Sequence, residues 1–368
     1  ASYGLVGNDN TNGARFLYLP GTWQFFQGHM GWNPQTQGAN FGTNGNWLQG
    51  VRELTAGNPN VTWETATKIN VGLDAGFFND KLHAYVDFFW EDRKDILVSN
   101  ASTLPAVTSL PANYVNEGRV KNHGFEVTMN WEQKFGDFRY SISPNFAFAR
   151  NQVIEMLEVR PMYEYLSRTG LPVGQPFGYD LFGYYEAGVT EQLYKEKYGA
   201  DMPDQNIELK NGDAVYVDLN EDGIVDQNDM KPLGYTDNPE ITYSVNFNFQ
   251  WKGLDFTMLW IGADHVSRTL RGYFRDQFGS TNTSALTQWV ADNSWTEDNP
   301  DALLPRISFT NRVHNNRDSQ AWMIDSKYVR LKNVEIGYTF TPKKSGSFFN
   351  YVRVYASGNN LLTFADFK

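Results

Sequence analysis

The sequence contains no cysteine and no long apolar run, and these two absences exclude several classes of protein. Without cysteine the chain has no zinc–thiolate site, disulfide scaffold or cysteine nucleophile, and it suits an oxidising compartment where cysteines could mispair. No stretch approaches the roughly 18 consecutive apolar residues of a membrane-spanning helix, since even residues 254–263 are interrupted by Asp255 and Thr257. A helical membrane protein is therefore excluded.

Basic residues are outnumbered, because 31 Lys and Arg stand against 42 Asp and Glu, for a formal net charge of -11. Nucleic-acid binding needs clustered Lys and Arg, so the composition argues against it.

Residues 1–7 lack a basic region, an apolar region and an initiator Met, which places any signal peptide outside this sequence. Residues 357–364 have the pattern of a strand that stops abruptly. We expect an internal fragment of a longer protein.

Aromatic residues are abundant, with 11 Trp, 20 Tyr and 26 Phe, and hydrophobic residues make up 41% of the chain. This composition excludes a disordered or fibrous chain. The mean hydropathy is nevertheless -0.51. Large apolar residues must therefore be interleaved with polar ones, which is the pattern of β-strands with one polar face.

Such alternation is found in four pairs of segments and predicts four antiparallel hairpins. In the first pair, residues 67–77 and 82–91 join through a turn at 79–81 and place Val71 and Val86 on the apolar face. The other pairs are residues 125–132 with 138–148, residues 241–251 with 254–260, and residues 328–340 with 352–356, with turns expected at 134–137, 252–253 and 342–346.

The predicted connections alternate in length, with short turns near residues 79, 135, 252 and 344 and long connections over 92–122, 150–240 and 263–327. Outer-membrane barrels have short periplasmic turns, long extracellular loops and strands of about 10 residues. Trp90, Trp131, Trp251 and Tyr338 lie near expected strand ends, where an interfacial aromatic girdle would be. We predict an all-β fold, an antiparallel transmembrane β-barrel segment with long extracellular loops. A soluble β-sandwich or propeller remains the alternative.

The long 150–240 connection contains a motif with the spacing of an EF-hand or dockerin calcium loop, over residues 218–229. Oxygen ligands are expected from Asp218, Asn220, Asp222, the Ile224 carbonyl, Asp226 and Asp229, with Gly223 permitting the sharp turn. Asp at the last position is shorter than the usual Glu. We predict a structural calcium site that holds an extracellular loop, the alternative being an acidic turn that binds no metal.

Motifs of catalysis are missing from the sequence. The five histidines have no metal-ligand spacing, and no nucleophile elbow, P-loop or dinucleotide-binding glycine motif is present. A carboxylate pair such as Asp87 and Glu126 is more simply explained by polar strand faces, so we expect no catalytic residue and no enzyme. Trp23, Trp32 and Trp47 could stack on sugar rings, or could pack the loops.

With these features together, the chain resembles the C-terminal half of the barrel of SusC/RagA-like TonB-dependent outer-membrane transporters of Bacteroidetes. The resemblance covers nearly all of the sequence, and the order of its segments is specific. They are residues 2–8, 58–64, 174–179, 212–223, 234–240 and 251–256, Asn299-Pro300 with Pro305-Arg306, and residues 328–334 with Gly337-Tyr338.

The resemblance implies that residues 1–368 are part of one 22-stranded barrel domain whose plug, first half and final strands lie outside this sequence. It implies import of glycan oligosaccharides or peptides, with a SusD-like surface lipoprotein as a cap and TonB supplying energy through the missing N-terminal part. Membrane lipid would surround the barrel. The chain alone would form an open, curved sheet with two free edges. The competing function is a secreted, calcium-stapled β-protein that binds carbohydrate.

Overall fold

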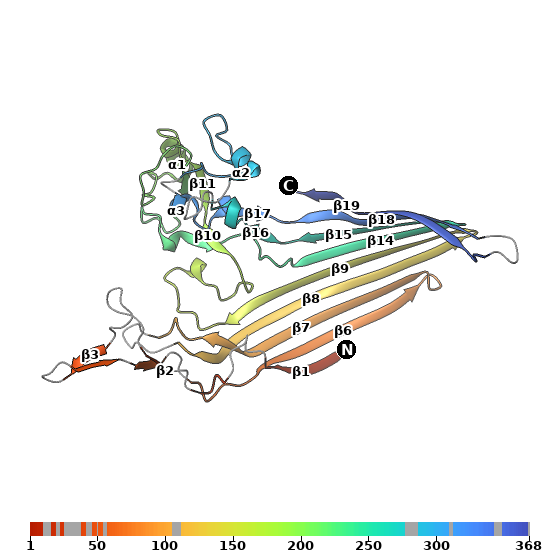
Figure 1. Ribbon diagram of the computed structural model, residues 1–368, viewed down its shortest axis with the longest axis horizontal. Coiled ribbons are helices and arrows are strands. Elements are labelled where there is room, and N and C mark those ends of the chain that lie inside the picture. Colours follow the sequence, from red (N-terminus) through yellow and green to blue (C-terminus); the bar gives the residue numbers. More distant parts are fainter. Residues whose placement is uncertain are drawn as a thin grey trace.

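The computed structural model describes residues 1–9, 16–19, 23–25, 38–41, 46–49, 51–53, 57–104, 112–276, 286–308, 312–341 and 348–366. Its main feature is an antiparallel sheet of nine long strands, which slants across Figure 1 with long connections at one end and short turns at the other. In spatial order the strands are β1 (Ser2–Asn8), β6 (Glu64–Phe77), β7 (Leu82–Ser99), β8 (Tyr114–Phe135), β9 (Phe138–Glu155), β14 (Ile241–Trp251), β15 (Leu254–Asp264), β18 (Tyr328–Phe340) and β19 (Val352–Ala365).

The four predicted hairpins are confirmed as β6–β7, β8–β9, β14–β15 and β18–β19. The second turn is tighter than expected, because β8 continues to Phe135 and β9 begins at Phe138. The third turn lies at 252–253 as predicted. The expected turn at 342–346 lies outside the described residues.

Several strands are longer than the sequence pattern indicated, and β7, β8 and β9 exceed it by the most. β7 and β9 have 18 residues each and β8 has 22, so the connections predicted at 92–122 and 150–240 begin later, after Ser99 and Glu155. Trp90 consequently lies in the middle of β7 and not near its end, whereas Trp131, Trp251 and Tyr338 do lie near the short-turn ends of their strands. Beyond Trp90 the backbone ladder continues although the side-chain alternation stops, which is why periodicity missed these extensions.

The sheet has two chemically different faces, called here the apolar face and the polar face. Val71 is opposite Phe88, and Phe88 is opposite Phe125, so these side chains share the apolar face. Gly72 is opposite Asp87, and Asp87 is opposite Glu126, on the polar face. The sheet is a single layer, and large side chains such as Leu73 (64% exposed) and Phe364 (60% exposed) have no second layer over them in the described part of the chain.

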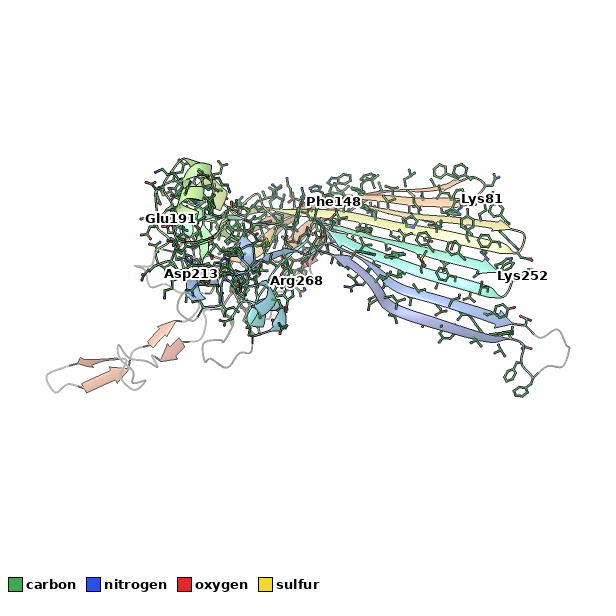
Figure 2. All side chains as sticks on the ribbon, turned by 90° about the horizontal axis from the view of Figure 1, so that it is seen from above. Lys81, Phe148, Glu191, Asp213, Lys252 and Arg268 are labelled. Carbon is green, nitrogen blue, oxygen red and sulfur yellow. The ribbon has the colours of Figure 1, made fainter. Side chains whose placement is uncertain are left out.

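A packed unit of loops lies at the long-connection end of the sheet and contains most of the buried residues (Figures 1 and 2). Lys81 and Lys252 mark the opposite, short-turn end, while Glu191 and Asp213 lie in the loop unit. Its elements are η2 (Glu164–Leu166), β10 (Phe177–Tyr179), β11 (Leu181–Tyr184), α1 (Thr190–Tyr198), β12 (Ala214–Tyr216), η3 (Gln227–Asp229), β13 (Met230–Pro232), β16 (Ser267–Thr269), η4 (Gly272–Phe274), α2 (Gln288–Asn293), α3 (Arg312–Asn315), η5 (Gln320–Trp322) and β17 (Met323–Asp325).

Two further short ladders near the N-terminus pair β2 (Trp23–Phe25) with β5 (Val51–Glu53) and β3 (Gly38–Phe41) with β4 (Asn46–Gln49). Trp23 and Trp47 are on these strands, but their side chains lie outside the described part, as does all of Trp32. The hypothesis that they stack on sugars therefore stays a prediction. None of the described helices is long and apolar enough to cross a membrane.

Candidate functional site

The polar face of β8, β9 and β14 carries a ladder of neutral amide and hydroxyl side chains. Thr128 Oγ1 donates to Asn145 Oδ1 over 2.8 Å, and Asn145 Nδ2 donates to Ser244 Oγ over 3.3 Å. Nearer the short turns, Ser143 donates to Asn130 and Asn248 donates to Ser141. These groups both donate and accept hydrogen bonds, so the face offers partners to hydroxyl groups and to amides alike.

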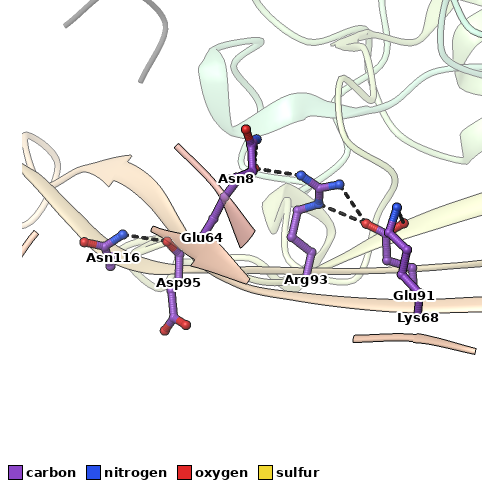
Figure 3. A network of polar contacts seen from close by, with 7 residues as sticks. All are labelled: Asn8, Glu64, Lys68, Glu91, Arg93, Asp95 and Asn116. Carbon is purple, nitrogen blue, oxygen red and sulfur yellow. Dashed lines mark hydrogen bonds and ion pairs between the residues drawn. The ribbon is translucent and has the colours of Figure 1, made fainter. Parts of the chain in front are cut away.

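A charged network lies on the same face nearer the loops and links β1, β6 and β7 (Figure 3). The Arg93 guanidinium donates to Glu64 Oε1 over 2.7 Å and to Glu91 Oε1 over 2.8 Å. Lys68 Nζ lies 3.4 Å from Glu91 Oε2, and Asn8 donates to Glu64. The network links the loop-side ends of these three strands and places charges of both signs on the polar face.

A recess of about 370 Å³ lies beside this network, where β7, β8 and β9 meet the loop after residue 233. Glu91, Arg93, Asn122, Asn151 and Glu240 line it. Its carboxylates, guanidinium and amides offer a ligand polar contacts, in keeping with the ladder below it.

The long connections on either side of β14–β15 fold together as one loop unit. One hydrophobic cluster joins Tyr179, Ala214, Tyr216 and Val225, and a second joins Val290, Leu304, Ala321 and Trp322. Leu181 packs against both clusters, so the two connections share a core. The unit is therefore one packed structure and not a set of separate loops.

A buried carboxylate ties the two connections together by charge as well. Asp213 is fully buried, and its Oδ1 accepts from Arg306 Nε at 2.5 Å and from Asn315 Nδ2 at 2.9 Å. Asn315 Oδ1 in turn accepts from the Ala214 amide at 3.0 Å. His314 donates through Nε2 to the Ala214 carbonyl over 2.7 Å, and burial lowers the pKa of this imidazole, which keeps it neutral.

The loop unit also contains two larger cavities. One of about 1030 Å³ lies between α1, β11 and residues 300–303. The other, of about 620 Å³, is lined by Leu270, Phe274, Trp289 and Met323, with Asp325 and Asp366 at its edge. The second combines aromatic faces with carboxylates, a combination that can stack on a sugar ring and accept its hydroxyl hydrogens.

The predicted calcium loop folds as a series of tight turns after β12. Asp218 accepts the amides of Glu221 at 2.7 Å and Gly223 at 2.7 Å, and Gly223 adopts a left-handed φ of 87°. Asn220 Nδ2 donates to Asp222 Oδ2 over 2.9 Å. The turn that Gly223 was expected to permit is therefore present, and it brings together Asp218, Asn220 and Asp222.

The other predicted calcium ligands, Ile224, Asp226 and Asp229, have bonding partners within the protein. Asp226 Oδ1 caps η3 by accepting the Asn228 amide at 2.7 Å, and the backbone of Ile224 forms a β-bridge with Asp204. Asp229 is fully buried and accepts the amides of Leu219 at 2.8 Å and Asp226 at 2.7 Å. Its burial raises the pKa of the Asp229 carboxyl.

A metal at this loop is therefore compatible with the described geometry only in part. The three residues at its tip converge, whereas the Asp229 oxygens already close the loop through backbone amides. Across the described ranges, no three His, Asp or Glu side chains are gathered closely enough to hold a metal ion. Calcium at 218–229 stays a prediction.

The charged network, the Asp213 cluster and the cavities were not identified from the sequence. Alternation predicted the polar face of the first hairpin only as far as Glu91, whereas Arg93 lies beyond that pattern, and its contact with Glu64 depends on the exact register of β6 and β7. Asp213 and Arg306 are 93 residues apart and had no local signal. Asp87 and Glu126, the carboxylates considered for catalysis, are direct neighbours in the β7–β8 register.

Both the sequence and the fold of this chain match those of known proteins. The family described as "TonB dependent receptor-like, beta-barrel" matches residues 13–361. The chain is 25% identical over 337 residues to TonB-dependent receptor P3 of Formosa agariphila, across 87% of this chain and 32% of that protein. It is 24% identical over 333 residues to TonB-dependent receptor SusC of Bacteroides thetaiotaomicron, across 84% of this chain and 30% of that protein.

Among solved structures, the RagAB peptide importer in the 'open-open' state superposes with a TM-score of 0.68 at 20% identity, covering 99% of this chain and 36% of that one. This likeness concerns the fold. The chain thus spans about a third of the length of the curated relatives that it matches.

Proposed function

The chain belongs to the TonB-dependent receptor β-barrel family, and from that premise we propose that it forms part of the wall and the extracellular loops of a SusC/RagA-like nutrient importer. Proteins of this family are in the outer membrane, which is where the chain is located. The observation that carries the proposal is the single-layer sheet with one apolar and one polar face, because lipid would cover the first and a channel would use the second.

The imported substrate is a glycan oligosaccharide or a peptide. The amide and hydroxyl ladder suits both classes, and the cavity with Trp289 and Phe274 favours a sugar ring. SusC and the RagAB peptide importer are both among the similar proteins. The proposed role is transport and not enzymatic catalysis.

Uptake by the living cell tests this function. Deleting the gene for the complete protein and restoring it on a plasmid should abolish and then recover uptake of either labelled oligosaccharides or labelled peptides. The complete protein should also require detergent for extraction. Unchanged uptake of both classes, together with recovery of the protein from the culture medium, would instead support the secreted carbohydrate-binding alternative.

The proposed partners are a SusD-like surface lipoprotein over the loop unit and TonB, which would contact the part of the protein outside this chain. Purifying the complete protein through an affinity tag should recover a surface lipoprotein in equal amount. Recovery of the protein alone under mild detergent conditions would contradict the first of these partners.

Calcium is proposed as a structural ion at the tip of the 218–229 loop. Asp218, Asn220 and Asp222 support it by their convergence, and carboxylate and amide oxygens are the ligands that Ca²⁺ prefers. Calorimetry of the complete protein should show a heat of calcium binding that the double variant Asp218→Ala and Asp222→Ala removes. Equal heats from both proteins, or none from the wild type, would refute the site.

A further inference from the structure

The apolar face changes character abruptly along β7, beyond the aromatic residues at its middle. Leu82, Val86 and Trp90 are on this face, and the eight residue steps from Leu82 to Trp90 belong to one strand. At about 3.4 Å per residue and a tilt of about 40°, they rise about 20 Å along the membrane normal, close to the roughly 25 Å height of a barrel's apolar band. Residues beyond Trp90 on this face therefore lie at the level of the outer lipid headgroups.

Those residues are charged, and most of them are basic. Asp92 follows Trp90 on the same face and is opposite Lys121 in β8. Lys94 is the next position of β7 on this face, opposite Thr65 of β6. Arg119 belongs to the same group, since its Nε and Nη2 donate to the two Asp92 oxygens at 2.9 and 2.6 Å.

The acids beside the two lysines have other partners, since Asp95, which follows Lys94, accepts a hydrogen bond from Thr65 Oγ1 at 3.0 Å. Asp92 is held in a two-pronged ion pair by Arg119, and Glu155 is opposite Arg119 in the β8–β9 register. Lys94 and Lys121 are exposed, and neither forms an ion pair within the part of the chain that the structure describes. Diagonal neighbours on adjacent strands are about 7–8 Å apart, so both ammonium groups can reach one anion.

We propose that Lys94 and Lys121, positioned around the Arg119–Asp92 pair, bind a phosphate group of an outer-leaflet lipid. A flexible lysine is a good point-charge ligand for phosphate, and Arg119 adds a planar donor beside it. The position just beyond Trp90 selects a lipid phosphate and not one free in solution, because the acyl chains would lie along the apolar face of β6, β7 and β8. This site is on the outside of the sheet and is separate from the polar face assigned to transport.

The test measures binding of lipid A by the purified complete protein in detergent, using native mass spectrometry. Each lysine beside an anionic lipid surface contributes about fivefold in affinity, so Lys94→Gln with Lys121→Gln should weaken binding of phosphorylated lipid A about 25-fold. The matched control, Lys81→Gln with Lys134→Gln, removes two exposed lysines near the short-turn end and should bind like the wild type.

Two further comparisons keep the proposal falsifiable whatever the variants do to folding. The wild-type protein should bind dephosphorylated lipid A about 25-fold more weakly than the phosphorylated form. Lys94→Arg with Lys121→Arg should retain binding, because the charge is kept. Equal binding of the two lipids, or equal losses in the Gln variant and its control, would overturn the proposal. No arm uses substrate uptake, so the result is independent of the function proposed above.

Discussion

At the scale of single residues, Asp229 shows how one buried carboxylate closes a loop. Both of its oxygens accept backbone amides, from Leu219 and Asp226, and no exposed surface remains on the residue. The sequence motif identified Asp229 as the last position of a calcium loop, and spacing alone could not show that its oxygens close the loop through amides. The position of Asp229 was predictable, but its hydrogen-bond partners depended on the fold of the whole loop.

Replacing Asp229 by Asn should destabilise the loop unit. The Asn side chain would turn an NH₂ group toward a backbone amide and leave a buried donor unpaired, at a cost of about 1–3 kcal/mol. Hydrogen exchange of residues 204–232 in the complete protein measures this effect as faster exchange. Asp201→Asn is the control, since the Asp201 side chain is 87% exposed and its ion pair with Lys195 lies at the surface, so exchange of residues 204–232 should stay close to that of the wild type. Equal exchange in Asp229→Asn and wild type would contradict the closing role.

His314 should make the loop unit sensitive to acid. Burial lowers the pKa of His314 below its ordinary value of 6.5, so the unfolded loop binds a proton more readily than the folded loop. The contribution of His314 to stability is thus complete above about pH 6.5 and is lost as the pH falls through the lower, folded pKa.

The acid sensitivity can be measured by hydrogen exchange of residues 177–217 at pH 7.5 and pH 5.0, corrected for the intrinsic effect of pH. His314→Gln can still donate to the Ala214 carbonyl but does not titrate, so it should remove most of the difference between the two pH values. An undiminished difference in the Gln variant would assign the effect to other groups.

At the scale of strands, the alternating pattern predicted four hairpins, both faces and two of the described turns. It did so because lipid-facing and polar positions differ chemically at every second residue. It failed where that contrast ends: beyond Trp90, polar residues such as Asp92, Arg93 and Lys94 occupy both faces, and only the backbone ladder continues. Pairing of β1 with β6 was also not predicted, since residues 2–8 alternate weakly.

Because neighbouring residues of β7 lie on opposite faces of the sheet, the same substitution should affect barrel assembly differently at the two positions. Val86 is opposite Leu73 and Val127 on the apolar face, whereas Asp87 is opposite Gly72 and Glu126 on the polar face. Val86→Arg should cost about 2–4 kcal/mol near the membrane midplane and Asp87→Arg much less. The heat-resistant fraction of the complete protein on unboiled gels measures barrel assembly. Equal losses from the two substitutions would contradict the assignment of the faces.

At the scale of the whole molecule, the buried residues are concentrated in the loop unit. The loop unit has a hydrophobic core, whereas the sheet has none. Tyr216, Trp322 and Leu304 are fully buried in the loop unit, whereas the sheet exposes large side chains on its apolar face. The sheet is open, with β1 and β19 at its edges in the described part of the chain, as the resemblance implied. The long-range joining of the two loop connections was unpredictable, because contacts such as Asp213 with Arg306 have no local sequence signal.

The absence of cysteine from this chain allows the most direct test of the central claim, that lipid covers one face and water the other. Single cysteines at Phe247 and Asn248, neighbours on opposite faces of β14, would each carry a fluorophore in the complete protein, freed of any other cysteine and placed in lipid vesicles. The account predicts quenching by brominated lipid at position 247 only, and by aqueous iodide at position 248 only. Iodide quenching at both positions, with no effect of brominated lipid, would contradict it.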